Sequence, residues 1–315
     1  LLERSNKDSQ SLKSALLFAL NTAASDAAFN KRWKRAIQLN ERSLELNPDQ
    51  ANTLSNLSVA KLRVNQLDQA LTKSQEAVNL DPKNSQIINN YATVLHERGA
   101  LEEATKLYKE VLSLEPSNTC ALSNLACATH QLGDLEQAEK LYRIHLEKFP
   151  SDTRVWVNLS GVLLSQHKWN EGWDAYNRRL DDPGPIMDVP PELLLWKGEK
   201  HPVRRLVVVH EQGLGDCFQF SRFLSELKNM AEDVIFSGPR KLHGLMRSSG
   251  LIDQCWDPKD TKFLWQDLSL SRQDRWVPMM SLPPLLGQGE CIHDQSKPYL
   301  KAPNWRIKKW AKTLR

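Results

Sequence analysis

The feature that most constrains this chain is a period of 34 residues in its first half. Prolines recur at this spacing, and small residues, asparagines and tyrosines keep the same step in columns of their own. Independent columns that share one period are typical of helical repeat proteins. The columns are Pro48, Pro82, Pro116 and Pro150; Ala36, Ala70, Ala104, Ala138 and Gly172; Asn56, Asn90, Asn124 and Asn158; and Tyr108, Tyr142 and Tyr176.

Each column has a physical role in a pair of antiparallel helices. A small residue lets the two helices approach closely, and a tyrosine fills the gap between neighbouring pairs. Proline ends the second helix, because it has no backbone N–H and disfavours helix in the residue before it. One pair cannot bury its apolar stripe alone, so stacked pairs create the core. We predict turns at Asn65–Gln66, Gly99–Ala100 and Gly133–Asp134, and five units at 17–50, 51–84, 85–118, 119–152 and a degenerate 153–184.

This pattern resembles the tetratricopeptide (TPR) family over roughly residues 17–184, with residues 1–16 as an N-terminal helix or tail. The resemblance implies an α-solenoid with a concave groove lined by the first helix of each pair. In the TPR array of protein O-GlcNAc transferases, to which this stretch is similar, asparagines at the matching position grip the backbone of a bound peptide. A carboxamide suits that task because it offers both a donor and an acceptor.

Two interpretations of the asparagine column stay open. The asparagines bind a protein or peptide partner in the groove, or they only pin a local turn or a neighbouring repeat. The residues concerned are Asn56, Asn90, Asn124 and Asn158.

The pattern changes after residue 180, where residues 185–202 form a linker by composition. Arg205–His210 is a short β-branched run typical of a buried parallel strand. A glycine-rich turn, an amphipathic helix and a second strand follow, an order that predicts a Rossmann-like α/β domain over 203–315. The expected elements are the turn Glu211–Asp216, a helix Cys217–Met230, a strand Asp233–Ser237, a helix Arg240–Ser249, strands Cys255–Trp256 and Arg275–Met280, and a helix Asn304–Arg315.

Five motifs in this part of the chain resemble a bacterial family in which TPR repeats precede a glycosyltransferase domain related to the lipopolysaccharide heptosyltransferases. The resemblance covers about residues 170–305 and implies a GT-B fold, in which two Rossmann-like lobes face each other. Only the first lobe fits before Arg315, so we expect a chain cut at both ends, without the lobe that holds most of the nucleotide-sugar, and inactive by itself. The motifs are Gly172-Trp173 with Tyr176, Trp196-Lys197-Gly198, Glu211–Asp216 (EQGLGD) with Gln219-Phe220, Pro278–Leu282, and Lys297–Leu300.

The EQGLGD turn is the candidate catalytic site, because open α/β sheets place ligands at the carboxyl ends of their strands. Gly213 and Gly215 permit positive φ and close approach of the backbone to a substrate. The candidate substrate-binding residues are Gln212, Gly213, Leu214, Gly215 and Gln219.

Asp216 has two interpretations. It caps the following helix, with Gln219 completing a capping box. Alternatively, as the resemblance implies, it is the general base that takes the proton from the attacking hydroxyl during inverting sugar transfer. The roles compete, because a helix N-terminus stabilises the carboxylate and weakens it as a base. Glu211 is the rival base, since a half-buried glutamate can have a raised pKa.

Composition and charge limit the partners, the cellular location and the cofactors that we expect for this chain. The net charge of +4 is too small to argue for a nucleic-acid partner, and no apolar run approaches the length of a membrane span. Five cysteines without a CxxC pair suggest reduced thiols in a cytoplasmic protein. We find no metal-ligand spacing and expect neither a metal nor a cofactor beyond a nucleotide-sugar substrate. The sequence therefore predicts a TPR-containing glycosyltransferase; the alternative is a non-catalytic interaction scaffold with a degenerate glycosyltransferase lobe.

Overall fold

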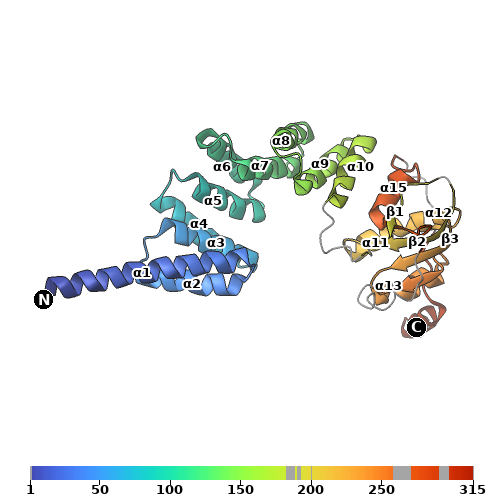
Figure 1. The fold of residues 1–315 in the computed structure, drawn as a ribbon, viewed down its shortest axis with the longest axis horizontal. Helices are drawn as coiled ribbons and strands as arrows, with labels where there is room; N and C mark the ends of the chain where they lie inside the picture. Colours follow the sequence, from blue (N-terminus) through green and yellow to red (C-terminus); the bar gives the residue numbers. More distant parts are fainter. Residues whose placement is uncertain are drawn as a thin grey trace. The chain divides into compact units, whose positions relative to one another are not determined.

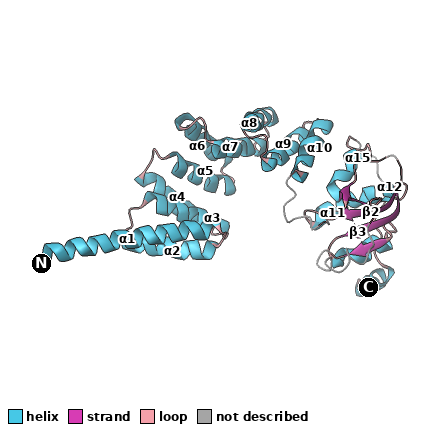
Figure 2. Cartoon of the chain, in the orientation of Figure 1, coloured by secondary structure: helices cyan, strands magenta, loops and turns pink. Residues whose placement is uncertain are grey.

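The computed structural model describes residues 2–181, 189, 193–199, 201–257, 271–290 and 298–314. The chain divides into two compact units, Leu1–Val162 and Leu163–Arg315. The first unit is helical and the second contains a parallel sheet, as Figure 1 and Figure 2 show. Residues 185–188, 190–192 and 200 of the predicted linker 185–202 lie outside the described residues, as does Lys297 of the last motif.

The first unit is a stack of helical hairpins, labelled in Figure 1. The helices are α1 (Leu2–Phe29), α2 (Trp33–Leu46), α3 (Ala51–Arg63), α4 (Leu67–Leu80), α5 (Ser85–Glu97), α6 (Leu101–Leu114), α7 (Thr119–Gln131), α8 (Leu135–Lys148) and α9 (Thr153–Ser165). The first helices α1, α3, α5 and α7 each pack on the second helix of their own pair, and the second helices α2, α4 and α6 each pack on the next first helix along the chain. The predicted repeat is therefore confirmed as a solenoid-like arrangement.

The sequence columns occupy the positions that their chemistry predicts. The alanines of the small-residue column are fully buried, and so are Tyr108 and Tyr142. In the second unit, a Cβ added to Gly172 would lie 2.7 Å from Cδ2 of Leu164, so this site tolerates only glycine without movement. Each proline stands two residues after the last residue of α2, α4, α6 or α8.

A fifth column, of backbone conformation, appears only in the structure. The residue that joins the two helices of a hairpin has positive φ each time, and these residues are also 34 apart. Glycine adopts this conformation freely, whereas other residues are strained in it. The five positions are Lys31 (57°), Asn65 (63°), Gly99 (87°), Gly133 (87°) and His167 (60°).

The second unit is built on a five-stranded, all-parallel sheet with the strand order β1-β5-β2-β3-β4. Central strand β2 pairs Val207 with Ile235 of β3 and with Trp276 of β5. Successive residues of β2 are fully buried, so both faces of the sheet are covered, as in α/β proteins. The strands are β1 (Leu194–Leu195), β2 (Val203–Val209), β3 (Ala231–Ser237), β4 (Gln254–Trp256) and β5 (Arg275–Pro278).

The helices of this unit differ from prediction after β2. The single helix expected at Cys217–Met230 is three short pieces, and the first of them begins at Leu214. The parallel sheet agrees with an α/β unit, and its assignment as a Rossmann-like lobe stays a prediction. The helices are α10 (Trp169–Asn177), η1 (Arg178–Leu180), α11 (Leu214–Phe220), η3 (Ser221–Phe223), α12 (Leu224–Leu227), α13 (Arg240–Ser248), η5 (Met279–Ser281), α15 (Leu282–Leu285) and α16 (Asn304–Thr313).

Candidate functional site

The predicted asparagine column lies at the sixth residue of α3, α5, α7 and α9. Equivalent positions of stacked helices share one face of the stack, so the four side chains form a row. Asn56 and Asn158 are exposed, whereas Asn90 and Asn124 are half-buried.

The two central asparagines bridge neighbouring repeats. Asn90 Nδ2 donates to Ser55 Oγ at 2.9 Å, and its Oδ1 accepts from Gln86 Nε2 at 3.0 Å. Asn124 Nδ2 is 3.5 Å from Thr93 Oγ1, a weak hydrogen bond. Each bridging carboxamide still has a second N–H and further acceptor capacity. The asparagines of this row can therefore hydrogen-bond to a neighbouring repeat and still bind a peptide backbone.

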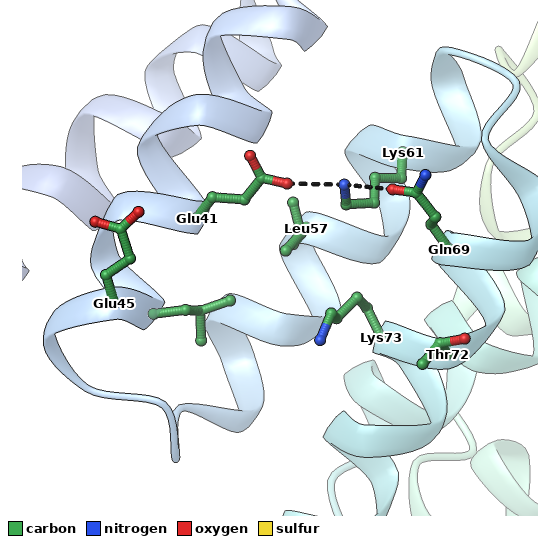
Figure 3. A pocket seen from close by; sticks show the side chains of 8 residues that line it. Glu41, Glu45, Leu57, Lys61, Gln69, Thr72 and Lys73 are labelled. Carbon is green, nitrogen blue, oxygen red and sulfur yellow. Dashed lines mark hydrogen bonds and ion pairs between the residues drawn. The ribbon is translucent and has the colours of Figure 1, made fainter.

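A pocket of about 580 Å³ opens on another face of the same helices (Figure 3). Its walls come from two successive second helices, α2 and α4, and its floor comes from α3. At about 100° per residue, Leu57 and Lys61 of the floor point roughly 100–140° away from Asn56 around the helix axis. The lining residues are Glu41, Leu44, Glu45, Leu57, Lys61, Gln69, Thr72 and Lys73.

Lys61 is the unusual member of this pocket, because a charged side chain there is only 8% exposed. Figure 3 shows its ammonium between Glu41 and Gln69, and the distances are 2.8 Å to Glu41 Oε1 and 2.9 Å to Gln69 Oε1. The positions 34, 68 and 102 residues later are buried and hold Leu95, Thr129 and Leu163. Sequence reasoning missed this site; its signal was one lysine in an otherwise uncharged column.

The same pocket recurs one repeat later, with a volume of about 540 Å³. Glu41 and Glu45 of the first pocket are replaced there by the uncharged Gln75 and Asn79. Tyr91 donates to Gln75 Oε1 at 2.5 Å, and burial raises the pKa of Tyr91. The two pockets thus occupy equivalent places in successive repeats and differ in their charged residues.

In the second unit, Glu211 follows β2 at the point where the strand order switches sides, between β2 and β5. Open α/β sheets bind ligands at this kind of place. The position is instead occupied by Arg179, which donates to both Glu211 oxygens at 3.0 and 2.8 Å. The side chains of Arg179 and Glu211 are 11% and 4% exposed, and Met280 N donates to Glu211 Oε1 at 2.9 Å. This geometry gives Glu211 a structural role and weakens its prediction as a base.

Asp216 forms a cap, although at a position other than the one predicted. The helix α11 begins at Leu214, so Asp216 is its third residue, and its Oδ2 accepts from Gly213 N at 2.9 Å. Gln219 has no part in this cap. The residue with positive φ is Gln212 (62°), whereas Gly213 has a φ of −87° and Gly215 is helical, so the expected conformational role of these glycines is wrong.

The predicted substrate contacts cluster around this cap at the carboxyl end of β2. Four of these five residues are exposed and Leu214 is half-buried, as is the catalytic candidate Asp216. Burial lowers the pKa of His210, which precedes Glu211, and the negative charges of Glu211 and Asp216 offset this only in part. The exposed contacts are Gln212, Gly213, Gly215 and Gln219.

Two other motifs of the second unit meet at a cavity of about 240 Å³ beside the same sheet edge. Trp196 and Lys197 line it from the end of β1, and Ser281 lines it from the segment after β5. Trp196 is 2% exposed, and its Nε1 has no acceptor among the described residues.

The described part of the chain contains neither a metal site nor a transmembrane helix. No cluster of three or more His, Cys, Asp or Glu side chains has a geometry that could hold a metal ion. No described helix combines the length and apolar character needed to span a bilayer.

Comparison with known proteins assigns the repeats to a family of TPR domains and assigns no family to the second unit. The model of the cytochrome c-type biogenesis protein H TPR domain matches residues 38–154. None of the curated proteins matches the chain. The match supports neither the predicted similarity to O-GlcNAc transferases nor the glycosyltransferase domain.

Solved structures that resemble the chain include the following three. Pseudomonas aeruginosa pilF is 19% identical with a TM-score of 0.49, covering 55% of this chain and 78% of its own. A TPR protein of Thermus thermophilus, TTC0263, is 18% identical with a TM-score of 0.49, covering 54% and 93%. YrrB, described as a TPR protein with an unusual peptide-binding site, is 15% identical with a TM-score of 0.42, covering 53% and 87%. With the 34-residue columns and the family match, the chain is a TPR repeat protein.

Proposed function

We propose that the TPR unit, a protein-interaction scaffold, binds an extended segment of a partner protein along its asparagine row. The observation that carries this proposal is the repetition of one carboxamide at the same helical position in four successive first helices, α3, α5, α7 and α9. The side chains of Asn56 and Asn158 are exposed and have no hydrogen-bond partner among the described residues, so each carboxamide is available to a ligand.

A carboxamide row suits recognition of backbone rather than of one side chain. Every peptide unit carries one N–H and one carbonyl, and a carboxamide satisfies both. Such a row binds segments of varied sequence, and neighbouring side chains then select among them. Asn90 and Asn124 add rigidity, because each is already held by the preceding repeat.

The test starts with peptides of random sequence displayed on phage and selected on the purified chain. A selected peptide, labelled with a fluorophore, is titrated with the wild type and with the double variant Asn56→Ala/Asn158→Ala. Loss of about one hydrogen bond per side chain predicts about a tenfold weaker Kd for the double variant. Both side chains are exposed, so the variant should unfold at the wild-type temperature.

Asn79→Ala is the matched control, because Asn79 is an exposed asparagine on the second helix α4 and lines the pocket of about 540 Å³. We expect it to bind like the wild type. The opposite pattern, in which Asn79→Ala weakens binding and the double variant does not, would transfer the peptide site to the pockets between second helices.

The second candidate function belongs to the sheet-bearing unit, for which we propose the acceptor-binding lobe of a sugar-transferring enzyme. The supporting observation is Asp216, because its Oδ2 holds the cap and its Oδ1 has no partner among the described residues. One carboxylate can thus order the turn and still face an acceptor hydroxyl. Glu211 is an unsuitable base because Arg179 and Met280 N engage its oxygens.

This proposal is tested by release of nucleoside diphosphate from activated sugars by the natural protein. Asp216→Asn should abolish release and leave the melting temperature nearly unchanged, since the amide oxygen still accepts from Gly213 N. Wild-type release by this variant would remove Asp216 from the base role. The predicted cytoplasmic location belongs to the same proposal, since activated sugars are made there.

A further inference from the structure

The helix α16 is exposed along its whole length, from Asn304 to Thr313. A helix of ten residues is marginal in water without packing, because nucleation is costly and few hydrogen bonds compensate for it. Three large apolar side chains of this segment are wide open: Ile307 is 54%, Trp310 is 59% and Leu314 is 81% exposed. An element of this kind gains its stability from a surface that covers it.

The apolar residues form one stripe. Ile307, Trp310, Ala311 and Leu314 follow the spacing i, i+3, i+4, i+7, which places them on one side of a helix. At about 100° per residue, Trp305 lies on the opposite side, where Arg306 stacks over its ring at 5.1 Å. The helix is therefore amphipathic, with one tryptophan on each face.

The polar side carries charge of one sign. Arg306 and Lys308 flank the apolar stripe on its two sides, and Lys309 and Lys312 complete the polar face. No acidic residue occurs from Asn304 to Leu314. Long basic side chains at the borders of an apolar stripe can extend their charged ends while their stems remain in apolar surroundings.

The start of α16 is fastened to α13, which adds to the positive charge. Lys301 N donates to Ser249 Oγ at 2.8 Å, and Ser248 Oγ donates to Lys301 O. The helix α13 itself presents exposed Lys241 and Arg247. The attachment joins the segment just before α16 to the end of a second basic helix, which adds positive charge near the start of α16.

We propose that α16 binds the surface of an anionic phospholipid bilayer, lying in the plane of the membrane with its apolar stripe in the headgroup region. Basic amphipathic helices with tryptophan bind there through apolar burial and attraction to anionic lipids. Charge complementarity selects this occupant. A second copy of α16 would bring four positive charges against four, and an apolar protein groove would not require a polar face of uniform sign.

Co-sedimentation of the whole chain with vesicles tests the proposal. Vesicles of equal parts phosphatidylglycerol and phosphatidylcholine should bind the chain at least tenfold better than vesicles of phosphatidylcholine alone, and 0.5 M NaCl should abolish most of the difference. Trp310→Ala and the pair Arg306→Gln/Lys308→Gln should each weaken binding about fivefold or more. All these side chains are exposed, so the variants should fold like the wild type, which thermal unfolding verifies.

Trp305→Ala is the control, because Trp305 is as exposed as Trp310, at 62%, but lies on the polar face. It should bind anionic vesicles within about twofold of the wild type. Three results would each overturn the proposal: no vesicle binding, equal binding to neutral and anionic vesicles, or equal losses for the two tryptophan variants. Sedimentation velocity adds one more, since a dimer dispersed by Trp310→Ala would identify a second copy as the occupant.

Discussion

Replacement of Arg179 by alanine would show whether Glu211 is a structural residue. The guanidinium donates to both Glu211 oxygens and also to Ser281 Oγ, and both charged side chains are almost fully buried. The variant leaves Glu211 as a buried charge with Met280 N as its remaining donor. Removing one member of a buried pair costs about 3–5 kcal/mol. The equilibrium constant for local opening of the sheet should therefore rise more than about a hundredfold.

Hydrogen–deuterium exchange with mass spectrometry measures this locally, which matters because two units unfold in one chain. Peptides that cover β2 and β5 should exchange faster in Arg179→Ala, whereas peptides from α3 and α4 should not change. Arg178→Ala is the matched control, since Arg178 is 57% exposed and its surface pairs should be worth less than about 1 kcal/mol.

Glu211→Gln separates charge from shape. The amide oxygen can still accept from Arg179 and Met280 N, so this variant should lose less local stability of the sheet than Arg179→Ala. If Arg179→Ala changed exchange in β2 and β5 by less than about fivefold, the pair would contribute under about 1 kcal/mol. Glu211 would then be stable in its buried position without Arg179, and the ion pair would no longer argue against Glu211 as a catalytic base.

Three further predictions concern stability. Lys61→Leu should keep the free energy of unfolding in urea or raise it by up to about 1 kcal/mol. Apolar replacement of a buried ion is often neutral or stabilising, and the next repeat already has Leu95 at this position. A loss above about 2 kcal/mol would contradict this prediction. Lys31→Gly should raise the melting temperature, since it removes about 1 kcal/mol of left-handed strain; an unchanged or lower value would contradict it. The lowered pKa of His210 means that the unfolded chain binds more protons than the folded chain. Protection of β2 against hydrogen exchange should therefore fall as the pH drops below about 6.5, the pKa of an unperturbed histidine. His210→Gln should flatten this dependence, and equal pH profiles for the variant and the wild type would contradict the prediction.

The repeats were predictable because their determinants are local and recur. Proline at Pro48 and its equivalents ends each second helix by the same backbone mechanism, and the alanine column marks each close helix contact. The positive φ at Lys31 and His167 was not predictable, because neither residue favours that conformation. Both adopt it because the hairpin geometry of the whole stack demands a left-handed residue there.

The sheet-bearing unit was predicted less well. The strand predicted at Arg205–His210 is β2 (Val203–Val209), and it was recognisable because buried parallel strands contain continuous apolar runs such as Leu206–Val209. The two-residue strand β1 was missed because its partner Trp276 lies about eighty residues later in the chain, and so short a segment has no periodicity of its own. The helix expected after the glycine turn is broken into short pieces that an amphipathic pattern does not distinguish from one helix.

By itself, the sequence determined the repeat length, the ends of the second helices and the recurrence of one asparagine per repeat, because helix ends and small-residue contacts depend on near neighbours along the chain. Only the tertiary structure decided that Arg179 neutralises Glu211, that Lys61 lies buried at the floor of a pocket, and that Asp216 caps from inside its helix. Burial and charge pairing join residues from separate elements, and the free energy of a buried ion depends on partners that no local pattern identifies.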